Sequence, residues 1–525
     1  MFDFLSGHRP PTLTGRAMIA TSHPLATSAG LEVLSSGGNA VDAAIAAAAV
    51  QAVVDPLMTG IGGDCFVLYA PKDGKVRALN GSGRAPATAS IDALKQAGLA
   101  DEIPHQSPHA VTVPGAISAW CRLHGDHGSL PLARIFQRAI EYAQNGFRIT
   151  PRVAQDWAGS ADVLSPEAAA TMTPDGKPPQ PGDQMAQPLL AQRFQQIAEY
   201  GPAAFYEGEA AASMVAFLRG LGGLHTLQDF ADGKDGATWH DPISATYRGY
   251  EVHECPPNGQ GVAALLILKL LEGFDMASLS EADRIHVLAE ATKLAYHHRD
   301  ALVGDPADCA DVVETLLSDQ TIATLRARIH MDRAMPPALW DEPEHKDTIY
   351  LCVVDDQGNA VSFINSIFQG FGSGLRDPGT GVLFQSRGAS FRLTKGHPNA
   401  IGPRKRPLHT IIPGMVTQNG RTVMPFGVMG GQYQATGHAQ FLSGIIDRGL
   451  SLQAAIDEPR SFATAGRLDI EPTVPQDVRA DLERRGHRLN VLTSPMGGGQ
   501  AIRIRDDGLL EGGSDSRKDG MALGF

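Results

Sequence analysis

The order of apolar and polar positions changes along the chain from a helix-like to a strand-like pattern. Through the first two-thirds, apolar residues recur at intervals of three and four, which is the period of a buried helix face. This spacing predicts helices over residues 25–34, 40–54, 132–144, 189–200, 262–273, 281–303 and 312–329. In the second of them, Asn39 is a suitable N-cap, and Asp42 lies in the first turn, where the helix dipole favours an anion. The first two-thirds is therefore expected to be mainly helical.

After about residue 345 the chain consists of short runs of β-branched and aromatic residues. These runs predict strands over residues 348–354, 360–368, 381–384, 410–415, 422–426 and 501–505. Turn-forming residues at 356–359 separate the first two runs and predict a hairpin. Two helices are expected among the strands, at about 432–447 and at 452–457. Strands with helices packed outside them indicate a layered α/β arrangement.

Composition and charge restrict the class of protein. The chain has 525 residues, 43% hydrophobic and 19% charged, which is enough to bury a large core. A formal net charge of −13 disfavours attraction to nucleic acid and to anionic lipid. The longest apolar run, residues 43–50, is shorter than the roughly 20 residues of a bilayer span, and residues 1–25 lack the apolar core of a signal peptide. We therefore expect a cytoplasmic protein that binds neither nucleic acid nor membranes.

Common catalytic and metal-binding motifs are absent from the sequence. It contains no P-loop, no H-E-x-x-H and no G-x-S-x-G. The five cysteines are widely spaced without a C-x-x-C pair, so we expect reduced thiols. His286, His297 and His298 fall on one expected helix, but no two of them have the i, i+4 spacing of metal ligands. We expect structural roles for these histidines, and neither a metal nor a cofactor.

A segment rich in proline and acidic residues, 331–347, separates the two halves and is expected to be exposed and poorly structured. It ends directly at an apolar strand that begins with Thr348. A threonine at a newly exposed N-terminus has a hydroxyl nucleophile and an adjacent amine base. Threonine is also a common strand residue, so the spacing alone leaves both interpretations open.

Short motifs along nearly the whole chain add a more specific indication. They lie at residues 37–44, 60–64, 113–115, 247–250, 347–350, 353–355, 358–362, 371–374, 400–403, 405–408, 430–431 and 513–517. In these motifs the sequence resembles the γ-glutamyltranspeptidase family of N-terminal-nucleophile hydrolases. The match of many motifs in order is more specific than any single one, and it favours Thr348 as a nucleophile.

The resemblance implies an α+β fold, the four-layer αββα sandwich of N-terminal-nucleophile hydrolases. It implies a proenzyme that cleaves itself between Asp347 and Thr348. The products would be a large fragment, residues 1–347, and a small fragment, residues 348–525, which stay associated as a heterodimer and form one composite domain. The freed amine of Thr348 has a reference pKa of about 7.7–8.0, which suits a general base near neutral pH.

The same resemblance assigns catalytic roles residue by residue. Ser366 occupies the place of a threonine that is hydrogen-bonded to the nucleophile, and it keeps the hydroxyl. Gly430 and Gly431 match the paired glycines whose backbone N–H groups hold the oxyanion, a role for which an approachable backbone is suited. The expected catalytic residues are therefore Thr348, Ser366, Gly430 and Gly431.

The expected substrate pocket departs from the family in the group that binds an amino-acid head. Ser390 replaces the acid that holds an α-ammonium, and Phe368 replaces an asparagine that contacts the same head. A serine cannot balance the charge of a buried ammonium, whose burial without a partner costs several kcal/mol. The resemblance therefore implies a substrate that lacks an α-ammonium group.

Groups that can bind a carboxylate are retained at the expected pocket. The family's serine pair becomes His409 and Thr410, and its carboxylate-binding arginine aligns with Ser82, two residues before Arg84. Arg387 replaces a glutamine. We expect Arg84, Arg387, His409 and Thr410 to form a carboxylate clamp.

These changes favour hydrolysis of a small carboxylate-bearing amide, without a cofactor. Residues 363–368 and 427–434 resemble the oxamate amidohydrolase branch of the family, which is cytosolic and releases ammonia from oxamate. Glutathione hydrolysis or γ-glutamyl transfer is the main alternative. Glutaryl-type or cephalosporin acylase activity is a third, and an unprocessed scaffold with a decayed site is the alternative from outside the enzymes.

Overall fold

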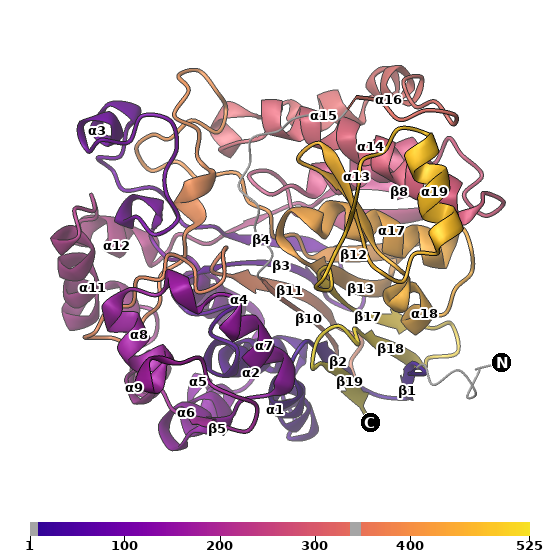
Figure 1. Ribbon diagram of the computed structural model, residues 1–525. Helices are drawn as coiled ribbons and strands as arrows, with labels where there is room; N and C mark the ends of the chain where they lie inside the picture. The colour runs from indigo at the N-terminus through magenta and orange to yellow at the C-terminus, as the bar shows by residue number, and fades with distance from the viewer. Residues whose placement is uncertain (1–8, 337–347) are drawn as a thin grey trace.

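The computed structural model describes residues 9–336 and 348–525. Within them, two seven-stranded antiparallel sheets lie face to face between two layers of helices (Figure 1). The first sheet contains, in spatial order, β1 (Thr12–Thr14), β18 (Leu510–Ser514), β17 (Gly498–Ile504), β13 (Arg421–Met429), β12 (Gly414–Gln418), β9 (Tyr250–Glu254) and β8 (Ile243–Tyr247). The second contains β19 (Met521–Gly524), β2 (Met18–Thr21), β10 (Ile349–Val354), β11 (Ala360–Ser366), β3 (Asp64–Ala70), β4 (Arg77–Gly81) and β7 (Thr238–His240). Each sheet takes strands from both sides of residue 348.

Helices cover the outer face of each sheet (Figure 1). The second sheet is covered by α1 (Pro24–Ser35), α2 (Ala40–Val54) and α4 (Ala116–His127), and the first by α13 (Gly261–Leu271), α17 (Gln434–Ile446) and α18 (Leu452–Asp457). Outside α13 lies α14 (Glu281–Leu302), against which pack α19 (Gln476–Arg484) and a small sheet of β14 (Ser461–Thr464), β15 (Arg467–Ile470) and β16 (Leu489–Val491). The other elements are α3 (Ile91–Gln96), α5 (Leu132–Ile135), α6 (Gln137–Asn145), α7 (Pro151–Ala158), α8 (Pro166–Met172), α9 (Pro188–Tyr200), α10 (Ala203–Tyr206), α11 (Gly208–Gly220), α12 (Leu227–Gly233), α15 (Val312–Leu317), α16 (Asp319–Arg326) and the pair β5 (Phe147–Arg148) and β6 (Gln184–Met185).

Strand β10 shows why the central strands are continuous apolar runs. Its odd-numbered residues belong to the core between the second sheet and its helices, and its even-numbered residues belong to the core between the two sheets. Successive side chains of a strand point to opposite faces, so both faces of β10 are covered. Every residue of the strand is buried as a result.

The structure confirms the expected four-layer α+β architecture. The helix expected at residues 40–54 has those bounds, and Asn39 and Asp42 form a capping box at its start. The expected hairpin is present as β10 and β11, whose register places Ile349 opposite Asn365. Local signals of spacing, capping and turn chemistry were sufficient for these elements.

Two of the expected strands are wrong in whole or in part. Residues 381–384 belong to no strand, and of them Leu383 and Phe384 form isolated bridges to Arg376 and Gly62. The strand expected over residues 410–415 begins only at Gly414. The reason is that the backbone N–H of Ile412 donates to the glutamine side chain at the start of α17, over 3.0 Å, and Pro413 has no N–H to donate.

The expectation of a mainly helical first two-thirds missed the strands β1 to β9. β3, over Asp64–Ala70, is buried throughout and apolar at consecutive positions, a pattern that does not distinguish a buried strand from a buried helix segment. Two expected helices are divided. Residues 132–144 form α5 and α6, which meet at the buried Phe136, and residues 312–329 form α15 and α16, where Ser318 caps the second helix.

No helix within residues 9–336 and 348–525 combines the length and the apolar character that crossing a bilayer requires. The exposed segment expected over residues 331–347 lies mostly outside the described residues, and Asp347 lies outside them as well. Of its described part, residues 331–336, none is buried.

Candidate active site

Thr348 lies directly before β10, where the hairpin places a second hydroxyl beside it. β11 ends at Ser366, and the pairing of Ile349 with Asn365 brings the residues next to this pair together. The Thr348 hydroxyl donates to Ser366 Oγ over 3.2 Å. Both residues have zero exposure. The structure therefore brings the expected nucleophile and the expected orienting hydroxyl within hydrogen-bond distance.

A buried arginine lies next to this pair of hydroxyls. Arg387 Nη2 donates to Ser366 Oγ over 3.5 Å, and Arg387 Nη1 donates to Thr410 Oγ1 over 2.9 Å. The backbone N–H of Phe368 also donates to Ser366 Oγ, over 2.9 Å. Arg387 has zero exposure, and a guanidinium stays protonated in proteins. A fixed positive charge is thus held one hydroxyl away from Thr348.

The ring of Phe368 forms one side of this cluster. The Arg387 guanidinium lies 3.9 Å from the ring centroid, and the ring of His105 lies 5.5 Å from it. Phe368 has a φ of +83°, a conformation that costs a residue with a side chain about 1–3 kcal/mol and that clusters at functional sites. Burial, followed by the charge of Arg387, lowers the pKa of His105 to about 4, so this imidazole is neutral at pH 7. Nothing in the sequence pattern singled out His105.

The glycine pair expected to bind the oxyanion follows the end of β13. Gly430 has a φ of +125° and Gly431 a φ of +57°, which residues with a side chain rarely adopt. A Cβ on Gly430 would lie 2.8 Å from the Cα of Gly497. Earlier in β13, Gly427 is covered by the ring of Tyr350. The start of β10 and the end of β13 therefore lie together across the two sheets, which places the glycine pair at the Thr348 end of β10.

Two buried polar residues that the sequence pattern did not single out connect this glycine pair to Thr410. Gln260 Nε2 donates to the backbone oxygen of Thr410 over 2.6 Å and to that of Gly431 over 3.2 Å. Gln260 Oε1 accepts from Arg299 Nη1 over 2.5 Å, and the same nitrogen donates to Gln432 Oε1 over 2.6 Å. The guanidinium thus orients the Gln260 amide, which holds the two loops at a fixed separation.

His409 is not placed as a donor to a substrate anion, which corrects the expected clamp. Its Nε2 lies 3.0 Å from Asp64 Oδ2, and an ionised carboxylate only accepts, so Nε2 carries the proton. Its Nδ1 accepts from the backbone N–H of Ile411 over 3.4 Å. Burial, and then the charge of Arg387, lowers the pKa of His409 to about 3, so the ring is neutral. Both nitrogens are engaged within the protein, and His409 positions its loop.

Asp64 is the second residue of this pair, and it joins several segments at the site. It is fully buried and accepts from the backbone N–H of Gly83 over 2.9 Å, from that of Gly115 over 3.1 Å and from Gln385 Nε2 over 2.9 Å. The motif at residues 60–64 was the only sequence signal for Asp64. Its function as a shared acceptor depends on contacts between distant segments.

The remaining expected pocket residues lie in different surroundings. The Ser390 hydroxyl is 2.9 Å from the backbone oxygens of both Arg387 and Leu408, so it serves the local backbone. Arg84 is exposed, donates to the backbone oxygen of Arg404 over 2.9 Å and lines a surface pocket. The structure therefore does not bring Arg84 into the buried cluster around Arg387.

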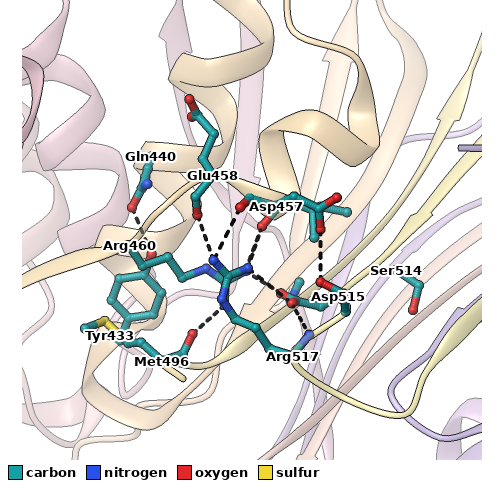
Figure 2. Close-up of polar contacts among 12 residues, drawn as sticks. Tyr433, Gln440, Asp457, Glu458, Arg460, Met496, Ser514, Asp515 and Arg517 are labelled. Atoms are coloured by element: carbon teal, nitrogen blue, oxygen red, sulfur yellow. Dashed lines mark hydrogen bonds and ion pairs between the residues drawn. The ribbon is translucent and has the colours of Figure 1, made fainter. Parts of the chain in front are cut away.

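A buried ionic cluster supports the segment that follows the glycine pair (Figure 2). Arg460 and Arg517 both form ion pairs with Asp515, which is fully buried. The guanidinium of Arg460 lies 5.8 Å from the ring centroid of Tyr433. Tyr433 ends the single turn Gly431–Tyr433, which leads from the glycine pair into α17. The motif at residues 513–517 is thus a structural support for this turn.

Buried neutral histidines predict that the fold loses stability in acid. Burial lowers the pKa of His23 to about 3 and of His225 to about 4, and burial with the Arg387 charge lowers that of His409 to about 3. An unfolded histidine has a pKa of about 6.5, so below that pH the unfolded state binds more protons than the folded state. The contribution of these histidines to the free energy of unfolding is therefore fully present above about pH 6.5. It falls towards pH 4 by up to about 1.4 kcal/mol per pH unit for each such group.

Thermal melts between pH 7.5 and pH 4.5 test this expectation. The melting temperature should fall continuously below about pH 6.5. In His225→Gln, which keeps a donor for the Val111 backbone oxygen, the fall should be shallower, because one titrating group is gone. A melting temperature that stays constant or rises on acidification from pH 7 to pH 5 would contradict the assignment.

Comparison with known families establishes where this fold and site belong. The family model described as γ-glutamyltranspeptidase matches residues 26–525. The chain belongs to the γ-glutamyltranspeptidase family. The match includes the β10–β11 hairpin and the glycine pair after β13, and it confirms the resemblance seen in the sequence motifs.

Relatives in the γ-glutamyltranspeptidase family align with nearly the whole chain. The glutathione hydrolase-like YwrD proenzyme of Bacillus subtilis is 37% identical over 97% of this chain and 98% of its own length. The oxamate amidohydrolase proenzyme of Klebsiella pneumoniae is 35% identical over 97% of this chain and 98% of its own length. A solved cephalosporin acylase from Bacillus halodurans is 41% identical, with a TM-score of 0.93 over 100% of this chain and 99% of that one.

These findings confirm an autoprocessed N-terminal-nucleophile hydrolase. The scaffold alternative is thereby set aside. The relatives are named as proenzymes, which implies that they are cleaved into subunits. The names of the relatives refer to three different substrates, so the substrate has to be inferred from the site.

Proposed function

We propose that Thr348 is the nucleophile of this self-cleaving amide hydrolase. The observation that carries the proposal is the hydrogen bond from Thr348 to Ser366 directly before β10. In maturation, Thr348 Oγ1 attacks the carbonyl carbon of Asp347, and the acyl group moves from nitrogen to oxygen to give an ester. Water then hydrolyses the ester and releases the Asp347 carboxylate and the Thr348 amine. The fragments 1–347 and 348–525 stay associated, because each sheet contains strands of both.

In turnover, the free amine of Thr348 accepts the hydroxyl proton while Oγ1 attacks the substrate amide. Ser366 orients the hydroxyl, and the backbone N–H groups of Gly430 and Gly431 stabilise the oxyanion. Loss of one such donor typically costs about 3–4 kcal/mol. The amine or ammonia leaves with the proton, and water hydrolyses the acyl-threonine. No cofactor takes part in these steps.

The substrate class follows from the groups beside the nucleophile. Arg387 contacts Ser366 Oγ and Thr410 Oγ1, so a positive charge and a hydroxyl lie beside the nucleophile pair. These two groups suit a carboxylate close to the scissile amide. Ser390 supplies no negative charge for an α-ammonium. We infer a carboxylate-bearing amide without an α-amino group, and oxamate is the best fit, because its carboxylate is bonded directly to the amide carbonyl. Its products are oxalate and ammonia.

A second candidate is acylase activity on a glutaryl-type side chain. It is favoured by the 41% identity and TM-score of 0.93 to a cephalosporin acylase. A glutaryl group also presents a carboxylate without an ammonium, but at a distance of three methylene groups from the amide. Glutathione hydrolysis and γ-glutamyl transfer rank below both, because the glutamyl donor brings the ammonium that Ser390 does not balance.

Steady-state rates on one mature preparation separate these candidates. The substrates are oxamate, glutathione and a glutaryl cephalosporin amide, each assayed with and without an amine acceptor. We expect the highest kcat/KM on oxamate, the acylase substrate second and the γ-glutamyl donor last. Strong glutathione turnover without oxamate hydrolysis would reject this order. Turnover of the glutaryl amide alone would assign the acylase function.

A further inference from the structure

Three side chains of types that can bind a metal lie together at α14 and the segment packed against it, apart from the residues around Thr348. His286 and Glu290 are four residues apart on this helix, so their side chains lie on one face. His487 lies between α19 and β16, which pack against α14. One ligand atom from each of the three residues lies within 4.8 Å of the others, and all three residues are buried. The nearest approach is 2.8 Å, between His286 Nδ1 and His487 Nε2.

The hydrogen bonds of His286 determine which of its nitrogens is available. His286 Nε2 lies 2.7 Å from the backbone oxygen of His330, and a carbonyl only accepts, so Nε2 carries the proton. In the neutral ring, the lone pair of Nδ1 then points towards His487. A histidine that donates its second N–H to a backbone carbonyl is the usual arrangement around a protein-bound metal.

The carboxylate of Glu290 is also oriented by neighbouring groups. Lys293 Nζ donates to Oε1 over 2.6 Å, and the backbone N–H of Met335 donates to Oε2 over 2.7 Å. Each carboxylate oxygen has a further lone pair, so the group can still act as a ligand. The ammonium of Lys293 is, however, a competitor for the same oxygen. The second nearby cation, Arg485, is balanced by ion pairs to Asp283 and to Asp481.

We propose that His286, Glu290 and His487 bind a divalent transition-metal ion of the Zn²⁺ class. Two imidazole nitrogens and one carboxylate oxygen are the donors that Zn²⁺ takes in three-residue protein sites, with water in the remaining position. At Zn–N distances of about 2.0–2.1 Å the two nitrogens would stand about 3.3 Å apart, so the rings separate by about 0.5 Å on binding. The sequence pattern did not indicate this site, because only pairs of histidines were tested for i, i+4 spacing. The residue four positions after His286 is Glu290, and His487 lies far away in the sequence.

The ion would join parts of the chain on either side of residue 348. His286 and Glu290 precede that residue and His487 follows it, so the site links the two fragments. His286, Glu290 and Lys293 also hold the backbone of residues 330–335, at the end of the described large fragment. The linking role rests on the proposed cleavage, whereas binding of the ion requires only the folded chain.

Metal titrations of the full chain test the proposal. The purified protein is treated with a chelator, dialysed and titrated with Co²⁺, whose visible absorption reports coordination, and then with Zn²⁺ by calorimetry. The site variant is His487→Gln. The matched control is His297→Gln, the same substitution at an exposed position of α14. Lys293→Met removes the competing ammonium and keeps the length of the side chain.

We expect one ion per chain and an affinity that falls by at least about 100-fold in His487→Gln, is unchanged in His297→Gln and rises about 10-fold in Lys293→Met. Binding that is weak, not stoichiometric, or insensitive to both His487→Gln and Lys293→Met would mean an adventitious ion only and would overturn the proposal. If His487→Gln does not fold, the affinity of Lys293→Met for the ion still tests the proposal, because it should rise. The uncut Thr348→Ala chain should bind the same ion, which separates failure of the site from failure of the proposed cleavage.

Discussion

Thr348→Ala is expected to give a single uncut chain of 525 residues without measurable amide hydrolysis. The substitution removes the one hydroxyl that is proposed to attack both Asp347 and the substrate, so a single change should abolish both steps. Removing the nucleophile of a hydrolase lowers kcat by roughly 10⁴-fold or more. A denaturing gel with intact-mass analysis measures the cleavage, and ammonia release from oxamate measures the activity.

Thr348→Ser is the matched variant, because it keeps the hydroxyl and the donor to Ser366 Oγ. We expect cleavage and turnover in this variant. Circular dichroism and thermal melts show whether Thr348→Ala is folded, since the side chain is buried beside Ser366. A folded Thr348→Ala chain that is still cut after Asp347 and still hydrolyses substrate would exclude Thr348 as the nucleophile.

Arg387→Gln is expected to reduce kcat/KM on carboxylate-bearing amides by about 10²–10³-fold, which corresponds to about 3–4 kcal/mol. The substitution removes the buried charge beside Ser366 and Thr410 and keeps a hydrogen-bond donor of similar shape. Cleavage of the precursor should continue, because Thr348 and Ser366 are unchanged. Rates on oxamate and on its neutral analogue oxamide separate a loss of carboxylate binding from a general loss of activity. The ratio of the rate on oxamate to the rate on oxamide should fall.

Arg84→Gln is the matched change for this measurement. Arg84 is exposed and contacts the backbone oxygen of Arg404, so a much smaller effect is expected than for Arg387→Gln. An equal loss in both variants, or a loss in Arg84→Gln alone, would place the substrate carboxylate at the surface pocket beside Arg84. The sequence alone favoured both arginines as carboxylate ligands. The burial of Arg387 beside Ser366, and the exposure of Arg84, now favour Arg387.

The elements predictable from the sequence are those whose signals are local. The capped helix at residues 40–54 and the β10–β11 hairpin depend on residues a few positions apart, and the structure contains both. Ser366 was assigned beside Thr348 through the family resemblance, and the register of this hairpin accounts for the contact between the two hydroxyls. The strand expected over residues 410–415 failed because a side chain of α17 takes the N–H of Ile412.

Contacts between distant segments could not be predicted from spacing. The Asp64–His409 hydrogen bond joins residues from both sides of Thr348, and it converts an expected substrate donor into a positioning residue. The Gln260–Arg299 pair likewise connects the Thr410 loop to the glycine pair through atoms far apart in the chain. Such groups have no periodic signal, and only the fold reveals their partners.

The N-terminal sequence and the intact masses of purified, fully active protein test most directly whether Thr348 becomes a chain terminus. We expect two chains, one of which begins Thr-Ile-Tyr-Leu at residue 348 and contains the remaining 178 of the 525 residues. Its amount should rise in step with amidase activity during maturation. A fully active preparation in which the chain is continuous through residue 348 would contradict Thr348 as an N-terminal nucleophile, whichever substrate the protein hydrolyses.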